Sequence, residues 1–116
     1  MKKIFTLAAC FISASMHVDA ARALDGTGWW VLIGSFPAEL KDTNAEHRYM
    51  EAKARPCGLR YFNDRSGKWL GFSEGRTAFV SRGAPFPSKA QAEGERQRIR
   101  QCFPDAYVKY GQYLGE

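Results

Sequence analysis

The chain has 116 residues, of which 45% are hydrophobic and 25% are charged, and a formal net charge of +5. This length gives room for one compact globular domain and excludes a second domain within these residues. The basic surplus is small, so it does not indicate a nucleic-acid partner.

Residues 1–23 have the features of a secretory signal peptide. A basic start, MKK, precedes the apolar stretch IFTLAACFISASM, and the small residues ARA provide a cleavage site. Cleavage after Ala23 leaves residues 24–116 as the mature domain, and cleavage after Ala20 is the alternative. We therefore expect an exported protein, periplasmic or secreted, with no nucleic-acid partner.

Two other fates of this N-terminal segment are less favoured. The stretch LAAC resembles a lipobox, which would make Cys10 a lipidated N-terminus. The apolar run before Cys10 is shorter than the about 7 to 15 residues of a signal-peptide h-region, and it continues beyond the cysteine. The whole run is also shorter than the about 20 residues of a transmembrane helix, so we expect no membrane span.

Two stretches of the chain share one pattern. They are GWWVLIGSFPAEL at residues 28–40 and RTAFVSRGAPFPSKAQAE at residues 76–93. Each contains an apolar strand, then a glycine, a phenylalanine and a proline, and finally a run of helix-forming residues. The pattern predicts two copies of a strand and helix unit.

The first unit leads into a helix and a second strand. The segment AEHRYMEAKA at residues 45–54 predicts a helix that ends before the following Arg-Pro pair. LRYFN at residues 59–63 is rich in aromatic residues and predicts the second strand. The glycine-rich connection that follows contains Trp69, Leu70 and Phe72, which we expect to fold back onto the domain.

The second unit leads into another helix and a fourth strand. Ser88 and Gln91 form a capping box, and helical spacing of apolar residues continues to Phe103. AYVKY at residues 106–110 alternates in polarity and predicts a strand. The order βαββαβ predicts an α+β, ferredoxin-like fold, in which a four-stranded antiparallel sheet has both helices on one face. The other face of that sheet is expected to be open.

The segments WWVLIGSF and FVSRGAPFPSKAQAE resemble the sporulation-related repeat, or SPOR, domain of bacteria. In that family each half begins with an aromatic and hydrophobic strand that ends in G-S-F or G-P-F, and a helix with an alanine-rich start follows. The resemblance covers nearly all of residues 24–116. It implies a noncatalytic, periplasmic module that binds peptidoglycan through the open sheet face and favours glycan strands stripped of their stem peptides.

Strand alternation assigns the two faces of the segment GWWVLIGSF. Side chains at alternate positions share a face, so one set is Trp29, Val31 and Ile33, and the other is Trp30, Leu32 and Gly34. The resemblance implies that the first set belongs to the core and the second to the open face. Trp30 is then placed to stack on a sugar ring, and the alternative is that it packs under the connection containing Trp69.

Two positions in this segment bear on the resemblance. Leu32 stands where many family members have a glutamine on the binding face, and its aliphatic side chain provides neither a hydrogen-bond donor nor an acceptor. Ser35 matches the serine of G-S-F and is a candidate ligand contact, although a serine ahead of a loop also bonds its own backbone.

The register of the third strand determines the rest of the candidate binding face. GAPF has one residue more than the usual GPF, so either a bulge follows Gly83, or Ala78, Val80 and Arg82 share a face. We favour the second alternative. It places Arg82 on the open sheet, where Tyr107 and Lys109 face the same side. Aromatic rings beside cations suit a carbohydrate that carries carboxylates.

Cys57 and Cys102 are the cysteines outside the expected signal peptide. An even pair in a small exported domain favours a disulfide. In the expected fold, however, the two helices run antiparallel, which places the cysteines toward opposite ends of the domain. A bridge requires Cα atoms within about 7 Å, so both the bridged and the free state remain open.

The sequence indicates no enzyme, metal or cofactor site. His47 is the one histidine after residue 23 and has no evident cysteine or serine partner. The chain lacks both a C-x-x-C pair and an H-E-x-x-H pattern. The alternative to glycan binding is a protein interaction module or inhibitor that uses the same sheet to bind an envelope protein.

Overall fold

The computed structural model of the chain describes residues 25–38 and 43–115. The expected signal peptide, its two alternative cleavage sites and Cys10 lie outside these residues. None of the helices within the described ranges combines the length and hydropathy of a membrane-spanning segment.

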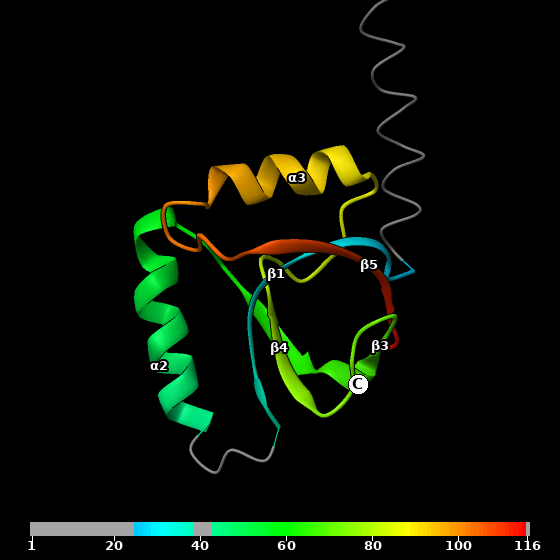
Figure 1. The fold of residues 1–116 in the computed structure, drawn as a ribbon, viewed down its shortest axis with the longest axis horizontal. Helices are drawn as coiled ribbons and strands as arrows, with labels where there is room; N and C mark the ends of the chain where they lie inside the picture. The colour runs from blue at the N-terminus through cyan, green and yellow to red at the C-terminus, as the bar shows by residue number, and fades with distance from the viewer. Residues whose placement is uncertain (1–24, 39–42, 116) are drawn as a thin grey trace, which may run out of the picture.

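The described residues form five strands, two α-helices and two short 3-10 helices (Figure 1). In chain order they are β1 (Thr27–Pro37), α2 (Thr43–Ala54), η1 (Arg55–Cys57), β2 (Phe62–Arg65), η2 (Ser66–Lys68), β3 (Trp69–Leu70), β4 (Arg76–Val80), α3 (Lys89–Arg98) and β5 (Tyr107–Tyr113). The strands form one sheet in the order β2-β4-β1-β5-β3, and every pairing is antiparallel.

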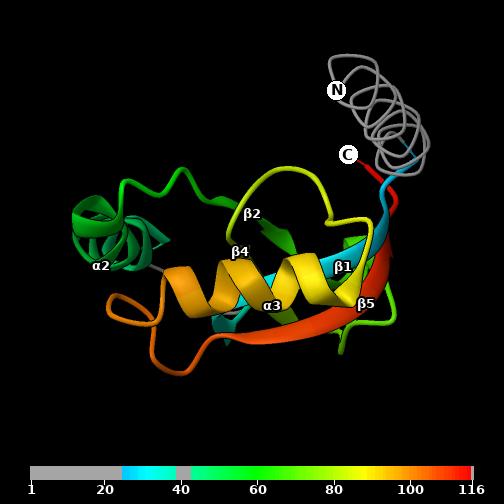
Figure 2. The same cartoon turned by 90° about the horizontal axis from the view of Figure 1, so that it is seen from above.

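The prediction of a four-stranded ferredoxin-like sheet with both helices on one face is wrong. The sheet has five strands and curls into a half barrel, because the chain passes through η2 directly from one edge strand, β2, to the other, β3. Helix α3 lies across the outer side of β1 and β5, whereas α2 stands beside one end of the sheet (Figures 1 and 2). The Tyr113 hydroxyl donates a hydrogen bond to the Asp64 carboxylate and so joins β5 to β2.

The additional strand is β3. It lies in the glycine-rich connection for which the sequence predicted no strand. Trp69 pairs with Tyr113 and Leu70 with Gln112. Trp69 and Phe72 are buried, as expected of a segment that folds back onto the domain. Leu70 is 56% exposed, so that expectation is wrong for this residue.

Several predicted element boundaries are displaced. Strand β2 begins at Phe62, three residues after the predicted start, and Leu59 and Tyr61 pack against the core instead. Helix α3 ends at Arg98, five residues before Phe103, where it was predicted to end. Its predicted start is confirmed, since the Ser88 hydroxyl accepts a hydrogen bond from the Gln91 amide at 3.2 Å.

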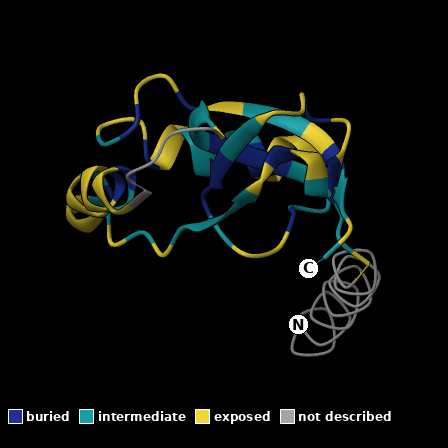
Figure 3. Cartoon of the chain, turned by 90° about the horizontal axis from the view of Figure 1, so that it is seen from below, coloured by how far each residue is buried: buried dark blue, intermediate teal, exposed yellow. Residues whose placement is uncertain are grey.

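Buried side chains form two hydrophobic cores, and the buried positions lie mostly along the central strands of the curled sheet (Figure 3). The helix-side core lies between the sheet and the helices and contains Val31, Met50, Ala54, Phe79, Ala92, Ile99, Phe103 and Ala106. The inner core fills the hollow of the half barrel and contains Trp30, Leu32, Trp69, Phe72, Ala78 and Val80. Within residues 25–38 and 43–115, the sheet thus has no open face of the kind predicted.

A bulge in β1 exchanges the two faces of this strand halfway along its length. The register with β4 shifts between Leu32 and Gly34, which inserts one residue and reverses the alternation beyond it. A Cβ atom on Gly34 would lie 2.8 Å from Met50 Cε, so Gly34 faces the helix-side core. The prediction that Gly34 shares a face with Trp30 and Leu32 is therefore wrong, and Ser35 takes its place on the inner side.

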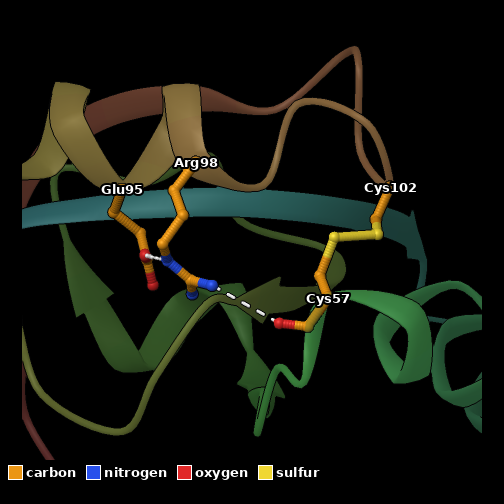
Figure 4. The surroundings of a disulfide bond; sticks show 4 residues. All are labelled: Cys57, Glu95, Arg98 and Cys102. Carbon is orange, nitrogen blue, oxygen red and sulfur yellow. Dashed lines mark hydrogen bonds and ion pairs between the residues drawn. A yellow bond between two sulfur atoms is a disulfide. The ribbon is translucent and has the colours of Figure 1, made fainter.

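Cys57 and Cys102 form a disulfide, with their Cα atoms 6.4 Å apart (Figure 4). The predicted conflict with the fold disappears because α2 and α3 do not lie antiparallel on one face. Instead, η1 at the end of α2 meets the loop after α3. Beside the bridge, Arg98 Nη1 donates to the Cys57 carbonyl at 3.4 Å, and Arg98 Nε donates to Glu95 Oε1 at 2.8 Å.

Candidate functional site

A cavity of about 230 Å³ opens into the half barrel where β4 and β5 begin. Strands β1, β4 and β5, η2 and the loop after β3 all contribute to it. We call it the cationic cavity, and its lining residues are Leu32, Ser35, Ser66, Phe72, Ser73, Arg76, Ala78, Tyr107 and Lys109. Three of these, Leu32, Phe72 and Ala78, belong to the inner core, which therefore forms an apolar floor.

The Arg76 guanidinium is held in place by Ser35 across the two paired strands. Arg76 Nε donates to the Ser35 hydroxyl, and Arg76 Nη2 donates to the Ser35 carbonyl at 3.2 Å. The Ser66 hydroxyl accepts from the Arg76 backbone amide at 3.1 Å, which fixes the base of the side chain. Because a guanidinium has five N–H donors, Arg76 keeps donors for an anionic ligand after both bonds to Ser35.

Lys109 supplies a second cation to the same cavity. Its Nζ lies 5.6 Å from the centroid of the Phe72 ring, over the apolar floor. Tyr107, two residues earlier on β5, is 49% exposed and offers both a ring and a hydroxyl. No carboxylate is among the described residues that line the cavity. The arrangement suits a ligand that combines a carboxylate with an apolar ring face and hydroxyl groups.

The predicted role of Trp30 as an exposed sugar platform is corrected by its burial. The side chain is 2% exposed, and its Nε1 donates to the Gly111 carbonyl at 3.1 Å. The Trp69 ring meets it edge to face, with ring centroids 5.6 Å apart. This is the alternative in which Trp30 packs under the connection that contains Trp69. Leu32 is 4% exposed and reaches the cavity as part of its floor.

Arg82 does not reach the cationic cavity. Ala78 and Val80 share the inner face as predicted, but β4 ends at Val80, so alternation no longer determines where Arg82 lies. Its Nε donates to the Ala84 carbonyl at 2.9 Å, and its Nη2 donates to the Pro85 carbonyl at 2.7 Å.

The Arg82 guanidinium also covers an aromatic ring of the same loop. It lies 3.7 Å from the centroid of the Phe86 ring. Burial lowers the pKa of Arg82 from its ordinary value, and the charge of Glu95 opposes this shift. Arg82 therefore stabilises the loop between β4 and α3, and it is not among the residues that line the cationic cavity.

Of the six predicted ligand contacts, the structure brings Leu32, Ser35, Tyr107 and Lys109 together around one cavity. The sequence did not identify Arg76, whose guanidinium also lines this cavity. Arg76 precedes Ala78 by two positions on β4, so strand alternation was a sufficient signal for its face. Ser66 and Ser73 had no such signal, because they lie in η2 and in a loop.

His47 lies away from this cavity, on α2. Its Nδ1 is 3.3 Å from the Tyr61 hydroxyl, and its Nε2 is 3.5 Å from Asn63 Nδ2. Within residues 25–38 and 43–115, no three histidine, cysteine, aspartate or glutamate side chains are grouped as metal ligands would be.

Comparisons of the chain with protein-family models, with curated proteins and with solved structures found no match.

Proposed function

We propose that the protein is an exported, noncatalytic module that binds the glycan strands of peptidoglycan through the cationic cavity. One observation carries the proposal: Arg76 and Lys109 both line a cavity with an apolar floor and several hydroxyl groups, and none of the described lining residues carries a carboxylate. The resemblance of WWVLIGSF to the SPOR domain points to the same ligand. The disulfide between Cys57 and Cys102 is typical of proteins that fold in an oxidising compartment.

The chemistry of a stripped glycan strand matches this cavity. When an amidase hydrolyses the amide bond to the stem peptide, the lactyl group of the sugar is left with a free carboxylate. A guanidinium binds a carboxylate through paired N–H donors, and an ammonium adds a point charge. Arg76 and Lys109 supply these two groups, and the half-exposed Tyr107 ring is available to adjoin the apolar face of a sugar.

The proposal is tested by cosedimentation with purified, protein-free sacculi. We expect the full-length protein, purified after expression, to sediment with sacculi, and more strongly after an amidase has removed the stem peptides. Arg76→Gln should lower the bound fraction. Its apparent Kd should be at least about tenfold higher than that of the parent, because a charge-assisted hydrogen bond is lost. Arg65→Gln removes an exposed arginine of β2 that does not line the cavity, and it should bind like the parent.

The outcomes also separate glycan binding from the alternative of an envelope-protein partner. That alternative is favoured by large hydrophobic side chains that are exposed on or next to β3 and β5, namely Leu70, Tyr110 and Leu114. Sedimentation with crude envelopes but not with protein-free sacculi would favour it. Equal sedimentation of the Arg76→Gln and Arg65→Gln proteins would contradict a role for the cationic cavity.

A further inference from the structure

A second cavity, of about 310 Å³, lies between α2 and the second half of β1. It exists because β5 begins at Tyr107, opposite Leu32, so the part of β1 beyond Leu32 has no strand on this side. Helix α2 stands there instead (Figure 1). We call this the α2 cavity. Its lining includes residues that do not line the cationic cavity, among them Ile33, Phe36, Met50, Lys53, Phe103 and Asp105.

The two cavities share part of their lining. Leu32, Ser35 and Tyr107 line both of them. Ligand pockets commonly measure about 300 to 1,000 Å³. The cationic cavity, at about 230 Å³, falls below that range, and the α2 cavity, at about 310 Å³, lies at its lower end. A ligand that occupies both cavities therefore needs more than one unit.

The two cavities differ in the charges that line them, and this difference indicates which kind of ligand group each cavity binds. Among the described residues, the lining of the cationic cavity includes Arg76 and Lys109 and no carboxylate, so it favours an anionic group. Within the same described part of the chain, the α2 cavity has Lys53 as its cation and Asp105 as its carboxylate, beside apolar side chains. A second anionic group would meet the Asp105 carboxylate, whereas sugar hydroxyls can donate to it.

Aromatic rings complete the lining of the α2 cavity. Lys53 Nζ lies 5.3 Å from the centroids of both the Tyr49 and the Phe103 rings, which orients its ammonium between them. Tyr107 lines both cavities and is half exposed. Its ring can adjoin one sugar face while its hydroxyl bonds a neighbouring unit.

From these observations we infer that the α2 cavity is a second subsite, which binds an uncharged sugar next to the acidic sugar held in the cationic cavity. The ligand class is an oligosaccharide in which a carboxylate-bearing unit is followed by a neutral one. The inference rests on the proposed function, which assigns the carboxylate to Arg76 and Lys109. It adds a separate site, with Asp105 and Lys53 as its polar contacts.

Isothermal titration calorimetry with two probes tests the inference on the full-length protein. The probes are N-acetylmuramic acid with its free carboxylate and the disaccharide that adds one N-acetylglucosamine. We expect the disaccharide to bind at least about tenfold more tightly. Asp105→Asn should weaken disaccharide binding by about tenfold and leave the monosaccharide Kd within about twofold. Lys53→Gln provides a second variant with the same expected pattern.

A matched control and three outcomes decide between the two claims. Glu51→Gln removes an exposed charge from α2 outside both cavities and should change neither Kd. If neither probe binds, both the proposed function and the subsite are wrong. If the monosaccharide binds but the disaccharide binds no more tightly, only the subsite is wrong. Equal weakening of both probes by Asp105→Asn would also overturn the subsite and leave the cationic cavity standing.

Discussion

Replacement of Trp30 by alanine is expected to lower the free energy of unfolding by about 3 to 5 kcal/mol, the range for loss of a large buried aromatic side chain. Trp30 is enclosed by the rings of Trp69 and Tyr113, with centroids 5.6 and 6.3 Å away. Its removal would leave a cavity in the inner core. It would also leave the Gly111 carbonyl without the hydrogen bond that it now accepts.

Urea denaturation followed by circular dichroism measures this change. Tyr110→Ala is the matched control, because this aromatic residue of β5 is 52% exposed, and we expect it to cost less than about 1 kcal/mol. A Trp30→Ala protein as stable as the Tyr110→Ala protein would show that Trp30 lies on an open surface. The inner core described above would then be wrong.

Loss of the disulfide is expected to lower the free energy of unfolding by about 4 kcal/mol, the chain-entropy value for a loop of this size. Cys57 and Cys102 are separated by 45 residues along the chain. The bridge also ties the end of α2 to the loop after α3. Met50 and Ala54 are the residues through which α2 joins the helix-side core, so the bridge should matter most for keeping α2 in place.

Urea denaturation with and without a reducing agent, on the parent and on a Cys57→Ser/Cys102→Ser protein, measures this contribution. The reducing agent should destabilise the parent to the level of the double variant and have no effect on that variant. A thiol assay on the nonreduced parent should find neither cysteine free. Two titratable thiols in the monomer, or a parent whose stability is insensitive to reduction, would contradict the bridge.

The sequence was sufficient to predict structure wherever one local pattern determined it. Alternation correctly separated Val31 from Trp30 and Leu32 up to the bulge. The capping pattern at Ser88 placed the start of α3. The number of cysteines favoured the bridge, whereas the predicted fold argued against it. The structure contains the bridge, and its position fits α2 beside the sheet rather than antiparallel to α3.

The sequence was insufficient where long-range packing decided the result. Nothing in the segment from Trp69 to Phe72 specifies that it pairs with the end of β5 and closes over Trp30. Without that closure, a flat sheet with an open face was the simpler expectation. The sequence also did not predict that η2 connects the two edge strands, β2 and β3, and so forces the sheet to curl. Polar residues and glycines in this connection gave no signal for it.

The candidate site shows the same division. Tyr107 and Lys109 were placed on the correct face because β5 alternates regularly across them. Ser35 reaches that face only because the register shifts between Leu32 and Gly34, and a bulge has no fixed sequence signal here. Arg82 was misplaced because its strand ends two residues earlier, so it bonds its own loop instead.

We expect ligand to bind at the cationic cavity while the inner core stays closed. An NMR titration of isotopically labelled protein with amidase-stripped glycan fragments tests both expectations at once. The largest backbone amide shifts should occur at Ser35, Ser73, Arg76 and Lys109, while the Trp30 indole N–H stays protected from solvent exchange. Shifts confined to α3, with none at the residues of the cationic cavity, would contradict binding there.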